Sequence, residues 1–95
     1  MNLADLIAPS DKAVAAQNIL NDKGTATLIS IKKDAVLKAH QSTTKALLVL
    51  LSGSAIYEEA ERLEGLSAYL DVVHIPARVT HKVTATEDAV LLLIQ

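Results

Sequence analysis

The chain of 95 residues contains no cysteine, no phenylalanine and no tryptophan, and only two tyrosines, Tyr57 and Tyr69. Without cysteine, the protein has no disulfides, no thiolate metal ligands and no cysteine nucleophile. Proteins bind single-stranded nucleic acids largely by stacking the bases on aromatic side chains, and this sequence has few of them. The composition therefore argues against a thiol-based site and against this mode of nucleic-acid binding.

An excess of charge of one sign and a long hydrophobic run are also missing. The formal net charge is -2 and the charged residues are scattered, so no basic face favours a nucleic-acid partner. Residues 1–5 lack the basic start and the long apolar run of a secretory signal. No apolar run approaches the roughly 20 residues that a membrane helix needs. These absences predict a cytoplasmic protein without a nucleic-acid or membrane partner, and the length predicts one domain.

The sequence does contain a repeated β-strand pattern, in which apolar and polar residues alternate or apolar residues form short runs. The expected strands share this pattern and end at polar or glycine-containing turns: residues 14–19, 24–32, 36–40, 46–51, 55–57, 67–75, 81–83 and 89–94. Residues 12–20 also suit a helix, so both interpretations stay open there. Residues 2–9 can form one short helical turn with Asn2 as its cap. The pattern as a whole predicts an all-β sandwich or barrel.

Two segments predict how neighbouring strands connect. Gly53 separates the apolar run 46–51 from residues 55–57, which is a hairpin signal. Residues 58–65 are the most polar stretch and predict an exposed hairpin turn. Their alternation gives no sign of the inward-facing carboxylates that an acidic metal site would need.

Two histidines stand in matching positions near the ends of strands. His40 precedes the apolar run 46–51, and His81 opens a strand with Val83 two residues further along the same face. Pro76 cannot donate to a sheet ladder, so it belongs at a strand end or on a sheet edge. The sequence therefore predicts that two strands each bring one imidazole to a common interior.

These two segments resemble the two motifs of the cupins, a family of small β-barrel proteins. The first motif is G-x5-H-x-H-x3/4-E-x6-G, and its two His, its Glu and its closing Gly fall, in that order, on His40, Ser42, Ala46 and Gly53. The second motif is G-x5-P-x-G-x2-H-x3-N, and its five defined positions fall, in order, on Leu70, Pro76, Arg78, His81 and Ala85. The spacings hold without a gap, whereas many residue types differ, and the resemblance covers residues 25–95.

The resemblance implies a cupin-type jelly-roll β-barrel in which residues 1–95 form one domain. Residues 1–24 would supply a short N-terminal extension and an early strand, which favours the strand at 14–19, and residues 25–95 would form the conserved barrel core. Cupins commonly hold a metal with three His and one Glu, and a divalent metal (Zn, Ni, Fe or Mn) is the one cofactor candidate here. Ser42 and Ala46 replace two of those ligands, and stable sites usually need at least three. We therefore expect a degenerate metal site of two histidines, His40 and His81.

Three further residues are candidates for the site. Strand alternation places His74 on the face opposite Val73 and Ile75. If that face is interior, a third histidine joins the metal site; if not, His74 is a surface residue. Lys45 and Arg78 border the expected barrel mouth, where either could bind an anionic ligand, although a simple solvent-facing position is favoured for both.

Three functions stay open at this point. The favoured one is a small-molecule-binding cupin whose barrel is lined by His40, Ser42 and His81. The first alternative is a metal-dependent cupin enzyme, of the isomerase or dioxygenase type, that uses these two histidines and His74. The second is a non-catalytic structural or interaction barrel whose interior is filled.

A homodimer is also expected. The run 46–51 is apolar at every position, yet a barrel strand turns only one face inward. Its alternate residues therefore point outward and need cover, because large exposed apolar patches usually mark interfaces. The final strand, 89–94, has the same property.

Overall fold

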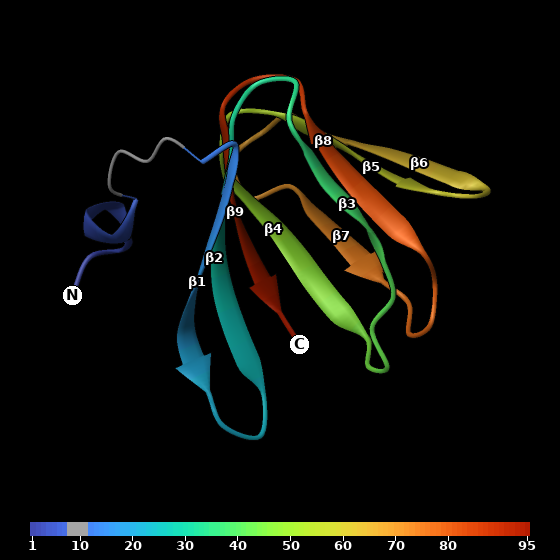
Figure 1. The fold of residues 1–95 in the computed structure, drawn as a ribbon, viewed down its shortest axis with the longest axis horizontal. Helices are drawn as coiled ribbons and strands as arrows, with labels where there is room; N and C mark the ends of the chain where they lie inside the picture. The colour runs from blue at the N-terminus through green and yellow to red at the C-terminus, as the bar shows by residue number, and fades with distance from the viewer. Residues whose placement is uncertain (8–11) are drawn as a thin grey trace.

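The computed structural model describes residues 1–7 and 12–95, and of residues 39 and 40 it describes the backbone alone. Two antiparallel sheets face each other across one core (Figure 1). The larger sheet contains, in spatial order, β1 (Val14–Asn21), β2 (Thr25–Ile31), β9 (Ala89–Ile94), β4 (Ala46–Ser52) and β7 (Val72–Ile75). The smaller sheet contains β3 (Val36–His40), β8 (His81–Ala85), β5 (Ala55–Glu59) and β6 (Arg62–Leu66). The predicted all-β jelly-roll barrel is confirmed.

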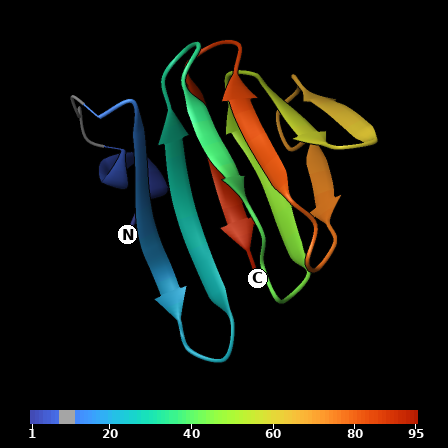
Figure 2. The ribbon, with the colours of Figure 1, turned by 45° about the vertical axis from the view of Figure 1, so that its right-hand side comes forward.

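The N-terminal extension is one short helical turn followed by a strand. The 3-10 helix η1 (Leu3–Leu6) is capped by Asn2, whose Oδ1 accepts a hydrogen bond from the N–H of Ala4 at 2.8 Å. The last two residues of the expected turn, 8 and 9, lie outside the described residues. Figures 1 and 2 show η1 beside β1, on the side of the larger sheet that faces away from the smaller one. Among the described residues, no helix has the length and apolarity that crossing a membrane requires.

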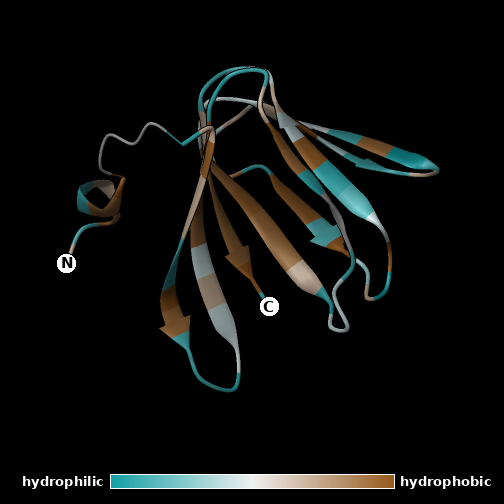
Figure 3. Ribbon diagram, in the orientation of Figure 1, coloured by the Kyte–Doolittle hydropathy of each residue, from teal (hydrophilic) through white to brown (hydrophobic). Residues whose placement is uncertain are grey.

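The core is built from the alternating inner faces of both sheets. In β4 the residues Ala46, Leu48 and Leu50 are buried, and the intervening Leu47 and Val49 are half-buried on the outer face. The inner residues pack against the buried side chains of the other strands, the largest of which are Ile31, Tyr57, Leu66, Val83 and Leu91. Figure 3 shows this concentration of apolar residues along β4 and β9, in the middle of the larger sheet.

The hairpin expected at Gly53 is wrong. β4 pairs with β7 and β9 in one sheet, whereas β5 pairs with β6 and β8 in the other, so the turn at Gly53 carries the chain between sheets. Gly53 has a φ of +77°, and a Cβ at this position would lie 1.9 Å from the carbonyl oxygen of Asp88. A glycine between two strands marks a turn, but the turn alone does not determine which strands pair.

Two other expected segments are shorter than predicted. The exposed hairpin turn of the polar stretch 58–65 is limited to residues 60 and 61, because Glu59 still belongs to β5 and Arg62 already belongs to β6. The strand expected over 67–75 covers only β7. The residues before it form a turn in which the Asp71 carboxylate accepts the N–H groups of Ser67 and Ala68, at 3.0 and 2.9 Å.

Substitution of Gly53 by alanine should destabilise the fold strongly. The left-handed backbone disfavours any Cβ, and the close approach of Asp88 leaves no room for one, so we expect a loss of about 2–4 kcal/mol in the free energy of unfolding. Gly65→Ala is the matched control, because nothing lies within 4 Å of a Cβ at that position. Urea unfolding followed by circular dichroism compares the two variants, and equal stabilities would contradict the described turn.

Candidate functional site

A cleft of about 250 Å³ opens at the end of the barrel where β5 finishes and β8 begins. The residues that line it come from these two strand ends and the β5–β6 turn: Glu58, Glu59, Ala60, Thr80, His81 and Lys82. Two hydrogen bonds join the loops at this end. The N–H of Arg78 donates to the carbonyl oxygen of Ser42 at 2.7 Å, and Gln41 Nε2 donates to Thr80 Oγ1 at 2.7 Å.

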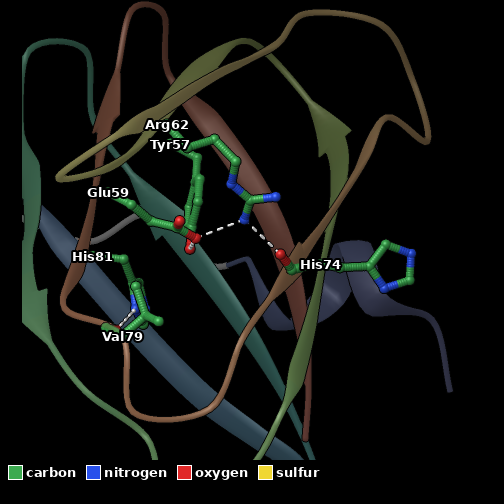
Figure 4. Close-up of polar contacts among 6 residues, drawn as sticks. All are labelled: Tyr57, Glu59, Arg62, His74, Val79 and His81. Atoms are coloured by element: carbon green, nitrogen blue, oxygen red, sulfur yellow. Dashed lines mark hydrogen bonds and ion pairs between the residues drawn. The ribbon is translucent and has the colours of Figure 1, made fainter.

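Beneath the cleft, three polar side chains form one connected group (Figure 4). The alternation of β5 turns Tyr57 and Glu59 to the inner face, and the β5–β6 register places Arg62 directly opposite Glu59. The Tyr57 hydroxyl donates to Glu59 Oε2 at 2.5 Å, and Arg62 Nη2 donates to the same oxygen at 2.6 Å. The guanidinium carbon lies 5.2 Å from the centroid of the Tyr57 ring, within the range of a cation–π contact.

Arg62 also connects the two sheets. Its Nη2 donates to the backbone carbonyl of His74 in β7 at 2.7 Å, while Glu59 belongs to β5 in the smaller sheet. Its Nε is buried and has no hydrogen-bond partner among the described residues. Leaving a buried donor unpaired is costly, so the two bonds of Nη2 and the contact with Tyr57 must hold this side chain in place.

The group shifts the pKa values of its own members. Burial, and then the hydrogen bond to Glu59, raise the pKa of Tyr57 to about 12, so the phenol keeps its proton at neutral pH. The hydrogen bond from Tyr57, together with Arg62, holds the pKa of the Glu59 carboxyl below its usual range. The hydrogen bond to Glu59 raises the pKa of Arg62. The site therefore holds an ionised carboxylate beside a permanent cation and a protonated phenol.

His81 completes the described part of the site. Its side chain is buried, and its ring stacks on that of Tyr57 with a centroid distance of 5.6 Å and an interplanar angle of 29°. Nδ1 lies 3.0 Å from the carbonyl oxygen of Val79. Because a carbonyl oxygen only accepts, Nδ1 is the nitrogen that carries the hydrogen. The β3–β8 register pairs the backbones of His40 and His81, so the two histidines do occupy neighbouring strands. The side chain of His40 lies outside the described residues.

The remaining predicted site residues are Ser42, Lys45 and Arg78. Ser42 is half-buried, and its Oγ donates to Gln95 Oε1 at 3.1 Å. Lys45 and Arg78 are exposed. Arg78 has a φ of +61°, as suits a position where the cupin motif has glycine.

His74 points away from the barrel interior. Its side chain is exposed, while Val73 and Ile75 on either side are buried, and Figure 4 shows the imidazole directed away from Arg62 and Glu59. Only its backbone carbonyl contributes to the interior group. The interpretation in which three histidines converge on a metal is therefore not compatible with the orientation of β7.

The described donors do not fit a full cupin metal centre. The described residues contain no group of three histidine or carboxylate side chains that could hold one ion. Glu59, the carboxylate nearest to His81 in the register of β5 and β8, accepts hydrogen bonds from both Tyr57 and Arg62. The methyl group of Ala46 offers no ligand. A stable metal site would need at least three protein ligands.

The sequence did not single out Tyr57, Glu59 or Arg62, and the expectation that residues 58–65 turn no carboxylate inward is wrong. A signal was available, because Ala55, Tyr57 and Glu59 alternate along β5, and the first two are buried core residues. A charged residue that continues such an alternation points inward. Arg62, across a two-residue turn, is the matching cation.

Glu59→Gln should lower stability at neutral pH and flatten its dependence on acid. A carboxylate with a depressed folded pKa stabilises the protein above the unfolded pKa of about 4.3, and this stabilisation is lost as the pH falls through the folded pKa. We expect a loss of about 2 kcal/mol at pH 7, which disappears towards pH 3. Glu58→Gln is the control, since its contact with Lys82 is 3.9 Å long and exposed, and a change of less than about 1 kcal/mol is expected. Chemical unfolding at several pH values measures both, and parallel pH profiles for the wild type and Glu59→Gln would refute this role.

No protein-family model and no curated protein matches the sequence. Solved structures do match. A cupin superfamily protein from Desulfitobacterium hafniense superimposes with a TM-score of 0.88 at 20% identity, over 100% of this chain and 87% of its own. A cupin 2 conserved barrel domain protein from Leptotrichia buccalis gives a TM-score of 0.87 at 24% identity, over 99% of this chain and 46% of its own.

A third solved structure matches over nearly the whole length of both chains. A cupin-2 domain containing protein from Shewanella frigidimarina gives a TM-score of 0.83 at 16% identity, over 100% of this chain and 92% of its own. At sequence identities this low, the structural similarity shows a shared fold and not a shared activity. Together with the two-sheet topology and the histidine positions, these matches show that this chain has the conserved-barrel fold of the cupins.

Proposed function

We propose that this protein is a cytoplasmic cupin that binds a small molecule in the cleft above Tyr57, without a complete metal centre. The proposal is supported by the position of two polar groups on the inner face of the barrel. Glu59 and His81 both line an open cleft. Concave sites with a few converging polar groups are the usual places for small ligands.

The chemistry of the cleft favours a ligand with hydrogen-bond donors. Among the described residues, both hydrogen bonds to Glu59 end on Oε2, which leaves Oε1 as an acceptor on an ionised carboxylate. Hydroxyl and amino groups can donate to it, and Lys82 and Glu58 at the rim can contact polar substituents. An anionic ligand is disfavoured at this position, because two carboxylates line the cleft.

A filled, non-catalytic barrel is the second candidate. It is favoured by the complete burial of Tyr57, which occupies the interior beneath the cleft. In that case Tyr57, Glu59 and Arg62 would serve the fold alone. The metal-dependent isomerase or dioxygenase is less well supported, because the described donors include no third ligand.

A cleft-blocking variant separates the first two candidates. Ala60 is exposed and lines the cleft, so Ala60→Trp should fill it without touching the core. Small polyols and amines would be screened by NMR against the wild type, Ala60→Trp and the control Ala68→Trp, which alters an exposed residue in another turn. We expect shifts at His81 in the wild type and the control, and none in Ala60→Trp. Compounds that bind all three alike, or a screen with no binder, would favour the filled barrel.

We also propose that the protein is a homodimer whose interface covers the part of the larger sheet's outer face formed by β4, β7 and the end of β9. Val49 pairs with Val72 and Leu92 across β7 and β9 on this face, and Val72 and Ile94 remain 43% and 41% exposed. A two-fold axis would bury this apolar patch on both copies at once.

Val49→Lys tests the dimer, because Val49 faces outward whereas Leu48 is buried in the core. A charge in the interface should yield a folded monomer or an aggregate. Light scattering gives the mass, and Lys45→Ala, on an exposed loop, is the control that should remain dimeric. A wild-type protein that is monomeric at tens of micromolar would rule this assembly out.

A further inference from the structure

A second cavity lies outside the barrel, between the N-terminal turn η1 and the outer face of the larger sheet. Its volume is about 410 Å³, larger than that of the cleft above Tyr57. Figures 1 and 2 show η1 standing off this face beside β1. The cavity is lined from one side by Leu6 and Ile7 and from the other by Leu28 and Val90.

Leu28 shows that this part of the outer face is covered. The β2–β9 register places Leu28 opposite Leu92, on the outer face, whereas Ile29 beside it belongs to the inner core. An outer-face leucine is normally at least partly exposed, yet Leu28 is only 3% exposed. Its neighbours across the cavity are Leu6 and Ile7. The cavity therefore has an apolar floor and an apolar roof.

The entrance carries positive charge. Lys12 and Lys32 line the cavity and are exposed. Asp88 is the one carboxylate among the described lining residues, and its Oδ1 already accepts the backbone N–H of Lys33 at 2.8 Å. A largely apolar interior with the exposed Lys32 at its edge is complementary to a molecule with a hydrocarbon chain and one negative head.

We propose that this cavity binds a medium-length alkyl carboxylate, with its chain between η1 and the sheet and its carboxylate beside Lys32. A cavity of about 150 Å³ holds the six non-hydrogen atoms of benzene, so a cavity of about 410 Å³ has room for a chain of about 10–12 non-hydrogen atoms with space left over. Octanoate and decanoate have this size. The site is independent of the cleft above Tyr57, which is lined by two carboxylates and would repel the same ligand.

The test titrates octanoate into the protein and follows the methyl NMR signals of Leu28 and Val90. Saturable shifts are expected at these two residues, with binding clearly weaker for butyrate, which is too short, and for octan-1-ol, which lacks the charge. Lys32→Ala should weaken octanoate about threefold, the size of an exposed charge contact. Octan-1-ol binding as tightly as octanoate, or shifts at Tyr57 and His81 in place of Leu28, would overturn the proposal.

A pair of alanine variants supplies the structural control. Ala15 and Ala26 are both half-buried on the larger sheet, and only Ala15 lines the cavity. Ala15→Leu should reduce octanoate affinity at least tenfold by filling the space, and Ala26→Leu should leave it unchanged. Ser30→Leu, also in the lining, replaces Ala15→Leu if that variant does not fold. Equal affinities in the filling variant and the control would refute the site.

Discussion

One guanidinium organises the interior of this barrel. Arg62 Nη2 is bonded both to Glu59 in the smaller sheet and to the His74 carbonyl in the larger one, so a single charged group joins the edges of the two sheets. Its charge is balanced by Glu59, and Tyr57 shields it from one side. The pair is half-buried, so bringing both charges together out of water has a cost. The hydrogen bond from Tyr57 to the carboxylate and the bond from Arg62 to the His74 carbonyl offset that cost.

The fold could be predicted well because it depends on periodicity and spacing. The apolar runs of β4 and β9 and the placement of His40 and His81 at paired strand ends are direct consequences of the sequence. Leu70 and Arg78 stand at two positions where the second cupin motif has glycine. Both residues nevertheless have the positive φ values that favour glycine, 70° and 61°. The backbone conformation persists at both positions although the residue that favours it has changed. The turn before His81 was expected, whereas the turn at Leu70 falls inside the strand that the sequence predicts over residues 67–75.

The site could be predicted only in part. Strand pairing depends on contacts between distant segments, so the local signal at Gly53 suggested a hairpin where the chain in fact changes sheets. A run of charged residues is usually solvated, so the sequence did not indicate that Glu59 and Arg62 point inward. His74 was correctly placed opposite Val73, but only the burial of each face shows which one is interior.

We propose that the charges of Arg62 and Glu59, and not a bound metal, order this barrel. The direct test is elemental analysis of protein purified without chelator or metal-affinity steps, combined with thermal unfolding before and after treatment with EDTA. We expect far less than one equivalent of Zn, Ni, Fe or Mn and the same Tm in both samples. One tightly bound equivalent, whose removal lowers the Tm by several degrees, would contradict it.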